Sequence, residues 1–264
     1  MEDFVKKEGV SIKNDYPIFK QNIPKKVITA GHYQLQFAVN HSELEEVQML
    51  RYAVFHAQNA DDQGIDSDHY DTVFHHSLVR DMRSNQLVGT YRMQTIEMAQ
   101  ANYGFYSNQE YCLNDFPDEV LVNSVEIGRA CVDSEHRNGH VLRLLWRSLG
   151  TYLTWNNKRY LFGCSSLFSQ STDEAYSVLD YLERKGHTHP SIWVNTRSKY
   201  SCKRPERLNC PHFDIPKLLR VYMTLGAKVC SPPAIDKEFE SIDYLTLFDL
   251  GGLKKQKGVK YLIV

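Results

Sequence analysis

Apolar and polar residues alternate along this chain with two different periods, which predict strands and helices in turn. Residues 32–39 alternate apolar with polar side chains, the two-residue period of a half-buried strand. From Leu44 to about residue 58 apolar side chains recur at helical spacing, behind a capping box formed by Ser42 and Glu45. We therefore expect folded structure to begin near Gly31, with a strand followed by a helix.

The rest of the chain continues this mixture of the two periods. Two strand-like runs, 74–81 and 87–94, flank the polar turn 83–86 and predict an antiparallel hairpin. Further strands are expected at 120–132, 160–168 and 244–249, and further helices at 138–156, 173–185 and 216–225. Residues 1–30 show no sustained period and are expected to form an N-terminal arm, whereas 31–264 form one domain. The predicted fold class is α+β.

The overall composition excludes several classes of protein. With 264 residues, of which 42% are hydrophobic, the chain can bury a sizeable core, and intrinsic disorder is excluded. Its 31 basic and 32 acidic residues exclude a uniformly basic nucleic-acid-binding protein. The sequence has no apolar stretch of membrane-spanning length, no signal-peptide pattern at its start, and six cysteines without a CxxC motif. We therefore expect a cytoplasmic protein with reduced thiols.

The charges are distributed unevenly along the chain. Between His41 and Asp71 eight acidic residues accompany one basic residue, a net charge of −7, and we call this stretch the acidic lobe. Between Arg197 and Arg220 seven basic residues accompany two acidic ones, a net charge of +5, and this stretch is the basic lobe. Either both lobes are solvated surface segments, or one of them contacts a cation and the other an anion.

Six motifs occur along the chain in a definite order. They are Gly89-Thr90-Tyr91-Arg92, Gly104-Phe105-Tyr106-Ser107 followed by Glu110-Tyr111, Glu126-Ile127-Gly128-Arg129, Leu144-Leu145-Trp146-Arg147, Leu161-Phe162-Gly163-Cys164, and Pro216 to Tyr222 leading to Leu225-Gly226-Ala227. The order of predicted elements is similar to that of the GNAT acyltransferases. The motifs resemble those of the bacterial N-acyltransferases that start ornithine-lipid and related amino-acid-lipid synthesis. This resemblance implies a single GNAT-like domain, with a mixed, mostly antiparallel twisted sheet flanked by helices.

A looser likeness extends to the acyl-homoserine-lactone synthases. The residues that look like the charged core of that family are Arg51, Asp66, Asp68, Asp71, Arg92, Glu126 and Arg129. The tryptophan usually found between the first helix and the acidic loop is missing here, because Gln58 to Gln63 contains none. That departure, together with the segment from Gly104 to Ser107, favours the lipid-type enzymes.

The resemblance implies an acyltransferase without a permanently bound cofactor. Its cosubstrate would be the acyl-phosphopantetheine of acyl carrier protein, or acyl-CoA. Its acceptor would be the α-amine of an amino acid such as ornithine. Its product would be a lyso-aminolipid with a long acyl chain, either unsubstituted or 3-hydroxylated. Two alternatives stay open: a signal synthase that uses S-adenosylmethionine as acceptor, and a GNAT-fold module that binds acyl carrier protein without turnover.

Glu126 is the expected general base, because an ammonium group cannot attack a thioester until a carboxylate takes its proton. The residue lies mid-strand between Val125 and Ile127, where burial would raise its pKa. The alternative is a structural ion pair with Arg129 or Arg92, which we expect beside it in the catalytic group. In a regular strand Glu126 and Arg129 point to opposite faces. A shared site therefore requires a β-bulge, which would also free a strand amide to hold the acyl carbonyl.

Arg137, Asn138, Gly139 and His140 precede a predicted helix, whose free amides and positive dipole end favour a phosphate group. We expect these residues to bind the phosphate of pantetheine. The segment holds fewer glycines than the standard acetyltransferase loop, which suits a single phosphodiester better than a pyrophosphate. The alternative is an ordinary turn into a helix.

Arg143 and Arg147, one helical turn apart, add to the positive charge of the basic lobe. We expect this surface to dock acidic acyl carrier protein by charge complementarity. Peripheral contact with anionic lipid at a membrane is one alternative, and a plain solvated surface is another.

The acidic lobe also allows two interpretations. Its aspartates could attract a cationic acceptor such as ornithine or lysine. For Asp68 and Asp71 we favour pairing with Arg51 and Arg92 inside the fold.

Histidines and cysteines gather in the C-terminal third, at His187, His189, Cys202, Cys210 and His212. Their spacing fits no standard zinc pattern, so we expect no metal site. Tyr176 or Tyr181 could protonate the departing thiolate, although tyrosines at helical spacing are more often core residues.

Overall fold

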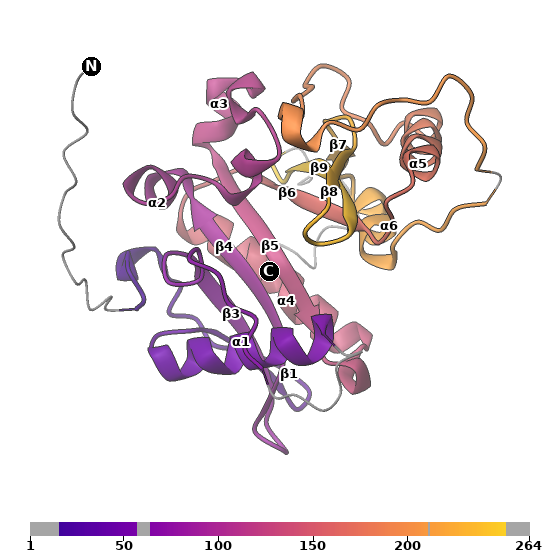
Figure 1. Cartoon of the computed structure of the whole chain (residues 1–264). Helices are drawn as coiled ribbons and strands as arrows, with labels where there is room; N and C mark the ends of the chain where they lie inside the picture. Colours follow the sequence, from indigo (N-terminus) through magenta and orange to yellow (C-terminus); the bar gives the residue numbers. More distant parts are fainter. Residues whose placement is uncertain (1–15, 57–63, 211, 252–264) are drawn as a thin grey trace, which may run out of the picture.

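The computed structural model describes residues 16–56, 64–210 and 212–251. Within them a sheet of nine strands follows the order β1-β2-β3-β4-β5-β6-β9-β7, and β8 pairs with β9 (Figure 1). The strands are β1 (Ile28–Ala30), β2 (Tyr33–Phe37), β3 (His75–Asp81), β4 (Gln86–Thr95), β5 (Ser124–Val132), β6 (Tyr160–Leu167), β7 (Lys228–Val229), β8 (Ala234–Asp236) and β9 (Ser241–Asp249). Neighbouring strands are antiparallel except β5 and β6, which are parallel. The predicted α+β class, with a mixed and mostly antiparallel sheet, is confirmed.

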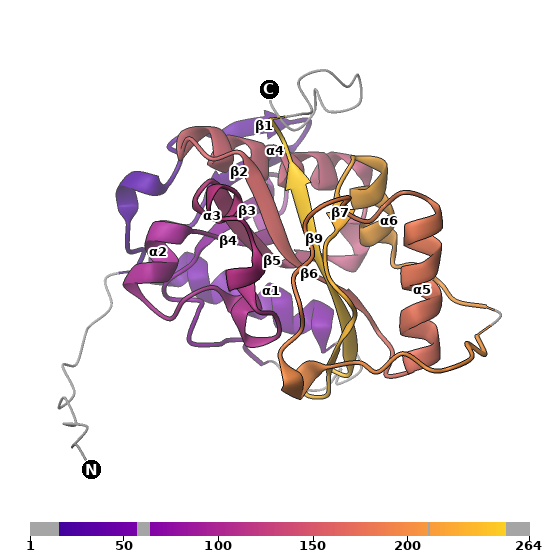
Figure 2. The same cartoon turned by 90° about the horizontal axis from the view of Figure 1, so that it is seen from above.

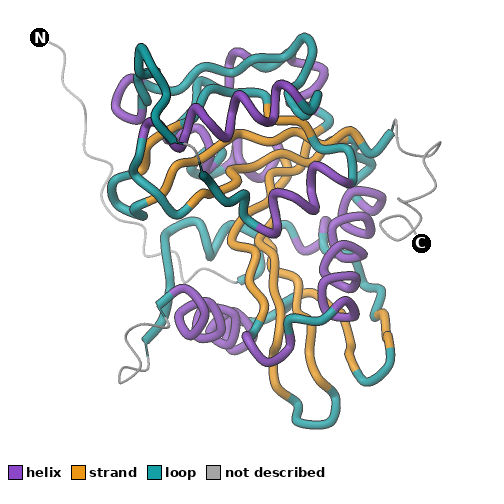
Figure 3. Tube along the Cα trace, turned by 90° about the vertical axis from the view of Figure 1, so that its right-hand side faces the viewer, coloured by secondary structure: helices purple, strands orange, loops and turns teal. Residues whose placement is uncertain are grey.

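Helices cover both faces of this sheet (Figures 2 and 3). They are α1 (His41–Phe55), α2 (Ile96–Ala101), α3 (Asp118–Val122), α4 (Gly139–Trp155), α5 (Thr172–Arg184) and α6 (Lys217–Thr224). On one face α4 packs Leu145 and Leu149 into the same hydrophobic cluster as Val125 of β5. On the other face α1 packs Val47 into a cluster with Leu78 of β3. None of the described helices combines the length and the apolar character needed to cross a membrane.

A short parallel seam joins β5 to β6. Ser124–Glu126 of β5 pair with Tyr160–Phe162 of β6, and the ladder between the two strands ends there. Further along, β5 pairs only with β4 and β6 pairs only with β9. We call this departure of the two strands beyond Glu126 and Phe162 the seam opening. Backbone groups of β5 and β6 that face each other there are not used by the ladder between the two strands, so we expect the seam opening to be the position of a site.

Gly163 lets β6 lie against the backbone of β5 at the start of the seam opening. A Cβ atom added to Gly163 would lie 2.1 Å from the carbonyl oxygen of Ile127. We expect Gly163→Ala to lower the free energy of unfolding by about 1–3 kcal/mol, because the backbone has to shift. Urea denaturation measures this. Gly128→Ala is the matched control, since a Cβ there meets no heavy atom within 4 Å. Equal stability of the two variants would contradict the close approach.

The first helix begins with a different cap from the one expected. Asn40 Oδ1 accepts a hydrogen bond from the amide of Glu43 at 3.0 Å. Glu43 Oε2 accepts one from the amide of Val39 at 2.7 Å. The predicted capping box of Ser42 and Glu45 was therefore wrong. A related arrangement forms two residues earlier, with the amide of Val39 in place of the N-cap amide, because Asn40 is an equally good N-cap and starts the helix at His41.

Folded structure also begins earlier than the expected boundary at residue 31. Residues Ile28–Ala30 already form β1 and pair with β2. Tyr16 and Ile23 are buried, and a ring nitrogen of His75 donates to the carbonyl oxygen of Ile18 at 2.8 Å. Residues 16–30 thus pack against the domain. The other residues of the expected arm, 1–15, lie outside the described part of the chain.

The strand expected to start at residue 120 starts at Ser124, because α3 occupies the preceding residues. Pro117 and the acidic pair Asp118 and Glu119 stand at the start of α3. A proline and two carboxylates are typical of a helix N-terminus, which explains the difference.

Candidate active site

A β-bulge in β5 places Glu126 and Arg129 on the same face of the sheet. Two residues of β5, Arg129 and Ala130, stand opposite the single residue Tyr91 of β4. Arg129 has a φ of 49°, in the left-handed region. The Glu126 carboxylate accepts from the amide of Tyr106, and the Arg129 guanidinium lies 5.8 Å from the centre of the Tyr106 ring. The bulge that a shared site required is therefore present.

Buried ion pairs form a charged core beside the bulge. Arg51 donates to both oxygens of Asp71, at 2.7 and 2.8 Å, and both side chains are fully buried. Arg92 Nη1 donates to Asp71 at 2.9 Å and to both oxygens of Asp68 at 2.7 Å. Arg129 contacts Asp68 at 3.3 Å. Asp68 and Asp71 are thus paired inside the fold, as favoured from the sequence.

The electrostatics of this core keep its carboxylates ionised. Arg51 Nε also donates to Asp66 at 2.7 Å. Burial works against ionisation of Asp71, but the hydrogen bonds and charge of Arg51 hold its pKa well below the usual range. Burial likewise opposes ionisation of Asp68, and the charge of Arg92 lowers its pKa. Such carboxylates are poor proton acceptors, so they are unsuited to act as the base. Two members of the acidic lobe, residues 61 and 62, lie outside the described residues.

Glu126 is buried, with 2% of its surface exposed, and accepts four hydrogen bonds. The amide and the hydroxyl of Ser107 both donate to Oε1 at 2.6 Å. The amide of Tyr106 and Nε2 of Gln94 donate to Oε2 at 2.9 and 2.8 Å. Burial raises the pKa of Glu126, and the donors, led by the Ser107 hydroxyl, oppose this rise. Among the described residues no arginine forms an ion pair with Glu126, so the alternative of a structural ion pair is wrong.

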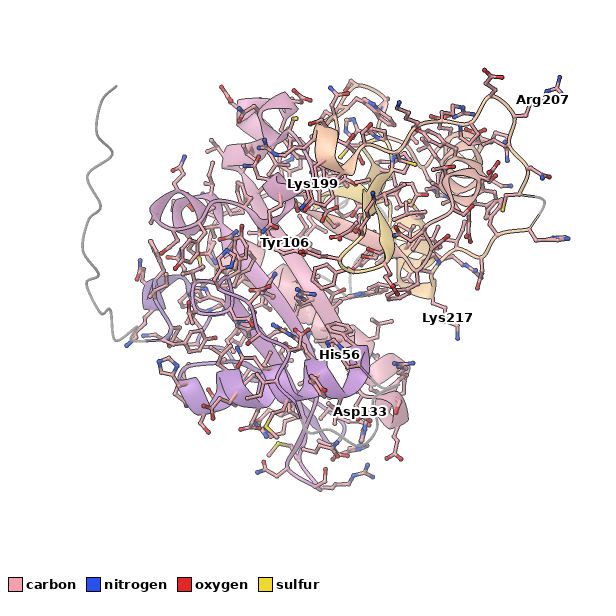
Figure 4. All side chains as sticks on the ribbon, viewed as in Figure 1. His56, Tyr106, Asp133, Lys199, Arg207 and Lys217 are labelled. Atoms are coloured by element: carbon pink, nitrogen blue, oxygen red, sulfur yellow. The ribbon has the colours of Figure 1, made fainter. Side chains whose placement is uncertain are left out.

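Tyr106 connects the parts of this site. Its ring lies over the guanidinium groups of Arg92 and Arg129, with centroid distances of 5.2 and 5.8 Å. Phe239, in the turn between β8 and β9, lies over the same Arg129 at 4.7 Å. The β8–β9 turn therefore contacts the bulge through Phe239, in the region of the labelled Tyr106 (Figure 4).

A second group of carboxylates, which sequence reasoning missed, lies next to this site. Glu110, Asp236 and Asp243 are buried, with 3%, 5% and 4% of their surface exposed. One oxygen of each lies within 4.8 Å of the others. The Sγ atom of Cys164 links this group to the site, at 3.8 Å from Glu110 Oε1 and 3.6 Å from Ser107 Oγ. We call these three residues the acidic triad.

An apolar cavity of about 30 Å³ lies on the α4 side of the seam. Its lining includes Ile127, Trp146, Leu161, Tyr222 and Phe248, from β5, α4, β6, α6 and β9. The apolar lining suits a hydrocarbon chain, but the volume is far below that of a fatty acyl group. A long chain can enter only if lining side chains move.

The expected phosphate-binding residues, Arg137, Asn138, Gly139 and His140, are exposed at the start of α4, just after β5. Asn138 caps the helix, and its Oδ1 accepts from the amides of His140 and Val141 at 3.0 and 3.2 Å. A phosphate bound here would compete with this cap for the same amides. Their binding role stays a prediction.

Arg143 and Arg147 lie half-buried on α4, one turn apart. Arg143 Nη2 lies 3.1 Å from Nδ1 of His140. Neither arginine forms an ion pair with another described residue. They add positive charge near the start of α4, and their docking role also stays a prediction.

The basic lobe is partly neutralised within the fold. Arg204 and Arg220 pair with aspartates at 2.7 and 2.9 Å. Arg207 and Lys217 are exposed and project from the edge of the molecule (Figure 4). The positive surface available to a partner is therefore smaller than the net charge of the sequence suggests.

Other sequence candidates take structural positions. Tyr176 belongs to the hydrophobic cluster beneath α5 and α6, and its hydroxyl donates to the carbonyl oxygen of Cys202 at 2.7 Å. Tyr181 packs against the same cluster. His189 Nδ1 accepts from the amides of residues 191 and 192, and Cys210 Sγ contacts the carbonyl oxygen of His212. These contacts are local packing and turn contacts.

Comparison with known proteins agrees with this architecture. A family model described as an acetyltransferase (GNAT) domain matches residues 50–147. The L-ornithine N(alpha)-acyltransferase of Rhizobium meliloti (strain 1021) is 28% identical, over 84% of this chain and 81% of the relative. The protein of the same name from Agrobacterium fabrum is 29% identical, over 84% and 83%. FeeM, an N-acyl amino acid synthase from uncultured soil microbes, aligns with a TM-score of 0.53 at 10% identity, over 87% of this chain and 98% of FeeM. The chain thus has a GNAT-like fold and resembles the bacterial L-ornithine N(alpha)-acyltransferases in sequence.

Proposed function

We propose that the protein is an N-acyltransferase that moves a long fatty acyl chain from a thioester to the α-amine of an amino acid. The observation that carries the proposal is the bulge, which brings a buried carboxylate, Glu126, together with Arg129 at the seam opening. The named relatives support an amino acid such as ornithine as the acceptor. The product is then a lyso-aminolipid.

The proposed donor is acyl carrier protein, and acyl-CoA offers the same thioester. The start of α4 follows β5 after the connection 133–138, and a phosphate held there leaves the pantetheine arm to run into the seam opening. The exposed Arg207 and Lys217, with Arg143 and Arg147, offer cations to an acidic carrier or to anionic lipid at a membrane surface. The apolar cavity next to Ile127 is where the acyl chain begins.

Glu126 serves as the proton acceptor in this mechanism. Both its oxygens are hydrogen-bonded, but the hydroxyl of Ser107 can rotate and leave a lone pair on Oε1 free. The amine loses its proton to Glu126, directly or through one water, and attacks the thioester carbon. An amide of the bulge around Arg129 stabilises the oxyanion. Attack leaves a positively charged nitrogen with two hydrogens in the tetrahedral intermediate. As the oxyanion re-forms the carbonyl, the C–S bond breaks and the thiol leaves with the proton that Glu126 had accepted. The nitrogen releases its second proton to solvent, which gives the neutral amide.

The test uses the full-length protein with acyl carrier protein loaded with chains of different length and 3-hydroxylation, and with the matching acyl-CoA. Each donor is offered a panel of amino acids and S-adenosylmethionine, and products are read by mass spectrometry. We expect an N-acyl amino acid, with ornithine among the accepted substrates. A lactone from S-adenosylmethionine would instead support a signal synthase. Carrier binding without any product would contradict catalysis and support a binding module.

A further inference from the structure

The acidic triad brings together three carboxylates from distant parts of the chain. Glu110 follows the short turn Tyr106–Gln109, Asp236 ends β8, and Asp243 lies in β9. Each is almost fully buried, and one oxygen of each lies within 4.8 Å of the other two. Three negative charges this close repel one another unless a cation or protons neutralise them.

The described part of the chain supplies no cation within salt-bridge distance of the triad. Asp243 accepts from the hydroxyls of Ser166 and Ser241 at 2.5 and 3.0 Å. Asp236 accepts from the backbone amides of residues 238 and 239 at 2.8 and 3.1 Å. These neutral donors fix the two side chains in place but cancel none of their charge.

Glu110 is the member left without such support. Its Oε2 is buried and has no hydrogen-bond partner among the described residues, and its Oε1 receives only the weak Sγ–H donor of Cys164. Burial and the charges of Asp243 and Asp236 raise the pKa of Glu110 to about 9. Burial and the charge of Asp236 raise the pKa of Asp243 to about 6, although the hydroxyls of Ser166 and Ser241 and the more distant charge of Arg129 oppose the rise. An unpartnered buried oxygen among like charges is what a cationic ligand would satisfy.

The triad also lies beside the proposed reaction centre. Cys164 contacts both Glu110 and Ser107, and Ser107 binds the carboxylate of Glu126. An amino acid with its α-amine at Glu126 would therefore direct its side chain toward the triad. The exposed turn between β8 and β9, which carries Phe239, lies between this region and solvent.

We infer that Glu110, Asp236 and Asp243 bind the side-chain ammonium of a diamino-acid acceptor. The inference rests on the proposed function. An ammonium group has three N–H donors, which match one oxygen from each carboxylate. A calcium ion takes about 6–8 oxygen ligands, more than the triad offers. The triad then selects a cationic acceptor and orients it so that the α-amine, and not the side-chain amine, is acylated.

The test compares ornithine with norvaline, which has the same carbon chain but lacks the side-chain amine. Glu110→Gln is the first variant, because Glu110 has the fewest bonds to the protein, and Asp236→Asn and Asp243→Asn are the second and third. We expect each to lower kcat/KM for ornithine at least about tenfold and to change that for norvaline little. Glu183→Gln, at an exposed acidic position of α5 outside both charged lobes, is the control and should change neither.

Three outcomes would contradict the inference. An equal loss of kcat/KM for ornithine and norvaline, with thermal unfolding unchanged, would show that the triad does not recognise the acceptor's side chain. Inactivation of the wild type by a chelator, with recovery on adding magnesium or manganese, would show that the triad holds a metal. If no amino acid is acylated, the proposed function fails, and calorimetry still tests the triad. Ornithine binding that is stronger than norvaline binding and is lost in Glu110→Gln supports it, and absence of that difference contradicts it.

Discussion

Replacing Glu126 with glutamine is expected to lower the rate of amide formation by about 10²–10⁴-fold, the usual contribution of a general base. The carboxylate is the proton acceptor in the proposed mechanism, and the glutamine amide cannot replace it. In the wild type each carboxylate oxygen of Glu126 accepts from a backbone amide, one from Tyr106 and the other from Ser107. In the variant the glutamine NH₂ group therefore faces one of these two N–H donors and cannot accept its hydrogen bond. Turnover under saturating donor and acceptor, with thermal unfolding measured in parallel, separates loss of the base from loss of the fold. Glu135→Gln, at an exposed position, is the control.

A second variant distinguishes proton transfer from a purely structural role of Glu126. The hydroxyl of Ser107 donates to Oε1 at 2.6 Å and opposes the rise in pKa that burial causes. Ser107→Ala removes that donor, so the pKa of Glu126 should rise further. The acid side of the pH profile of kcat/KM should then move to higher pH. A profile that keeps its position, or near-normal turnover of Glu126→Gln at every pH, would remove Glu126 from the role of base.

Replacing Asp71 with asparagine is expected to lower the free energy of unfolding by about 3–5 kcal/mol, the cost of breaking a fully buried ion pair from one side. Asp71 holds both Arg51 and Arg92, and each would keep a buried charge with fewer acceptors. Chemical denaturation measures the loss. Asp66→Asn, at a partly exposed position, provides a milder version if the first variant does not fold.

The matched control for Asp71→Asn is Asp214→Asn. Asp214 pairs with Arg220 at 2.9 Å on the surface, where such a pair contributes about 0–1 kcal/mol.

The pH dependence of the free energy of unfolding gives an independent check of the role of Asp71. Because the folded-state pKa of Asp71 is lowered, its contribution is present above the ordinary pKa of about 3.9 and is lost as the pH falls below it. Asp71→Asn should flatten the loss of stability in acid, and an unchanged acid dependence would contradict this account.

The site features that could be predicted from the sequence depend on alternation within one strand. Glu126 stands between two apolar residues in β5, which predicts its burial. The incompatible spacing of Glu126 and Arg129 predicts a bulge if they share a face, and the bulge is observed. The charge pattern predicted that Asp68 and Asp71 pair with arginines, but it did not predict which atoms form the hydrogen bonds of these ion pairs. The groups that donate hydrogen bonds to Glu126 could not be predicted from the sequence, because Ser107 lies in an irregular loop that has no periodic pattern.

Several elements lack a sequence signal for physical reasons. β1, β7 and β8 contain three, two and three residues, too few to establish a two-residue period. They form because the neighbouring β2 and β9 offer backbone partners. The cap of α1 was misplaced because Asn40 and Ser42 are both good N-caps, and only the packing of the preceding strand decides between them.

The acidic triad was missed because its members are far apart in the sequence. Glu110 lies in a loop, and the pairing of β8 with β9 brings Asp236 close to Asp243. One signal was available: Asp243 stands between Ile242 and Tyr244 in a strand whose other side chains are apolar or carry hydroxyls until Asp249 at its end. A carboxylate in that position requires a partner. Its partners, however, depend on a register that no local pattern specifies.

The seam opening has a further consequence for how the protein behaves in solution. Where β5 and β6 part, each has a side on which no described strand pairs with it. Such unpaired strand edges on an outer rim attract other chains and promote aggregation. Here the two edges face each other inside the molecule, with α4 and α6 lining one face of the seam and the β8–β9 turn closing over the other. The fold can therefore keep backbone donors and acceptors available to a substrate without presenting them to a neighbouring protein.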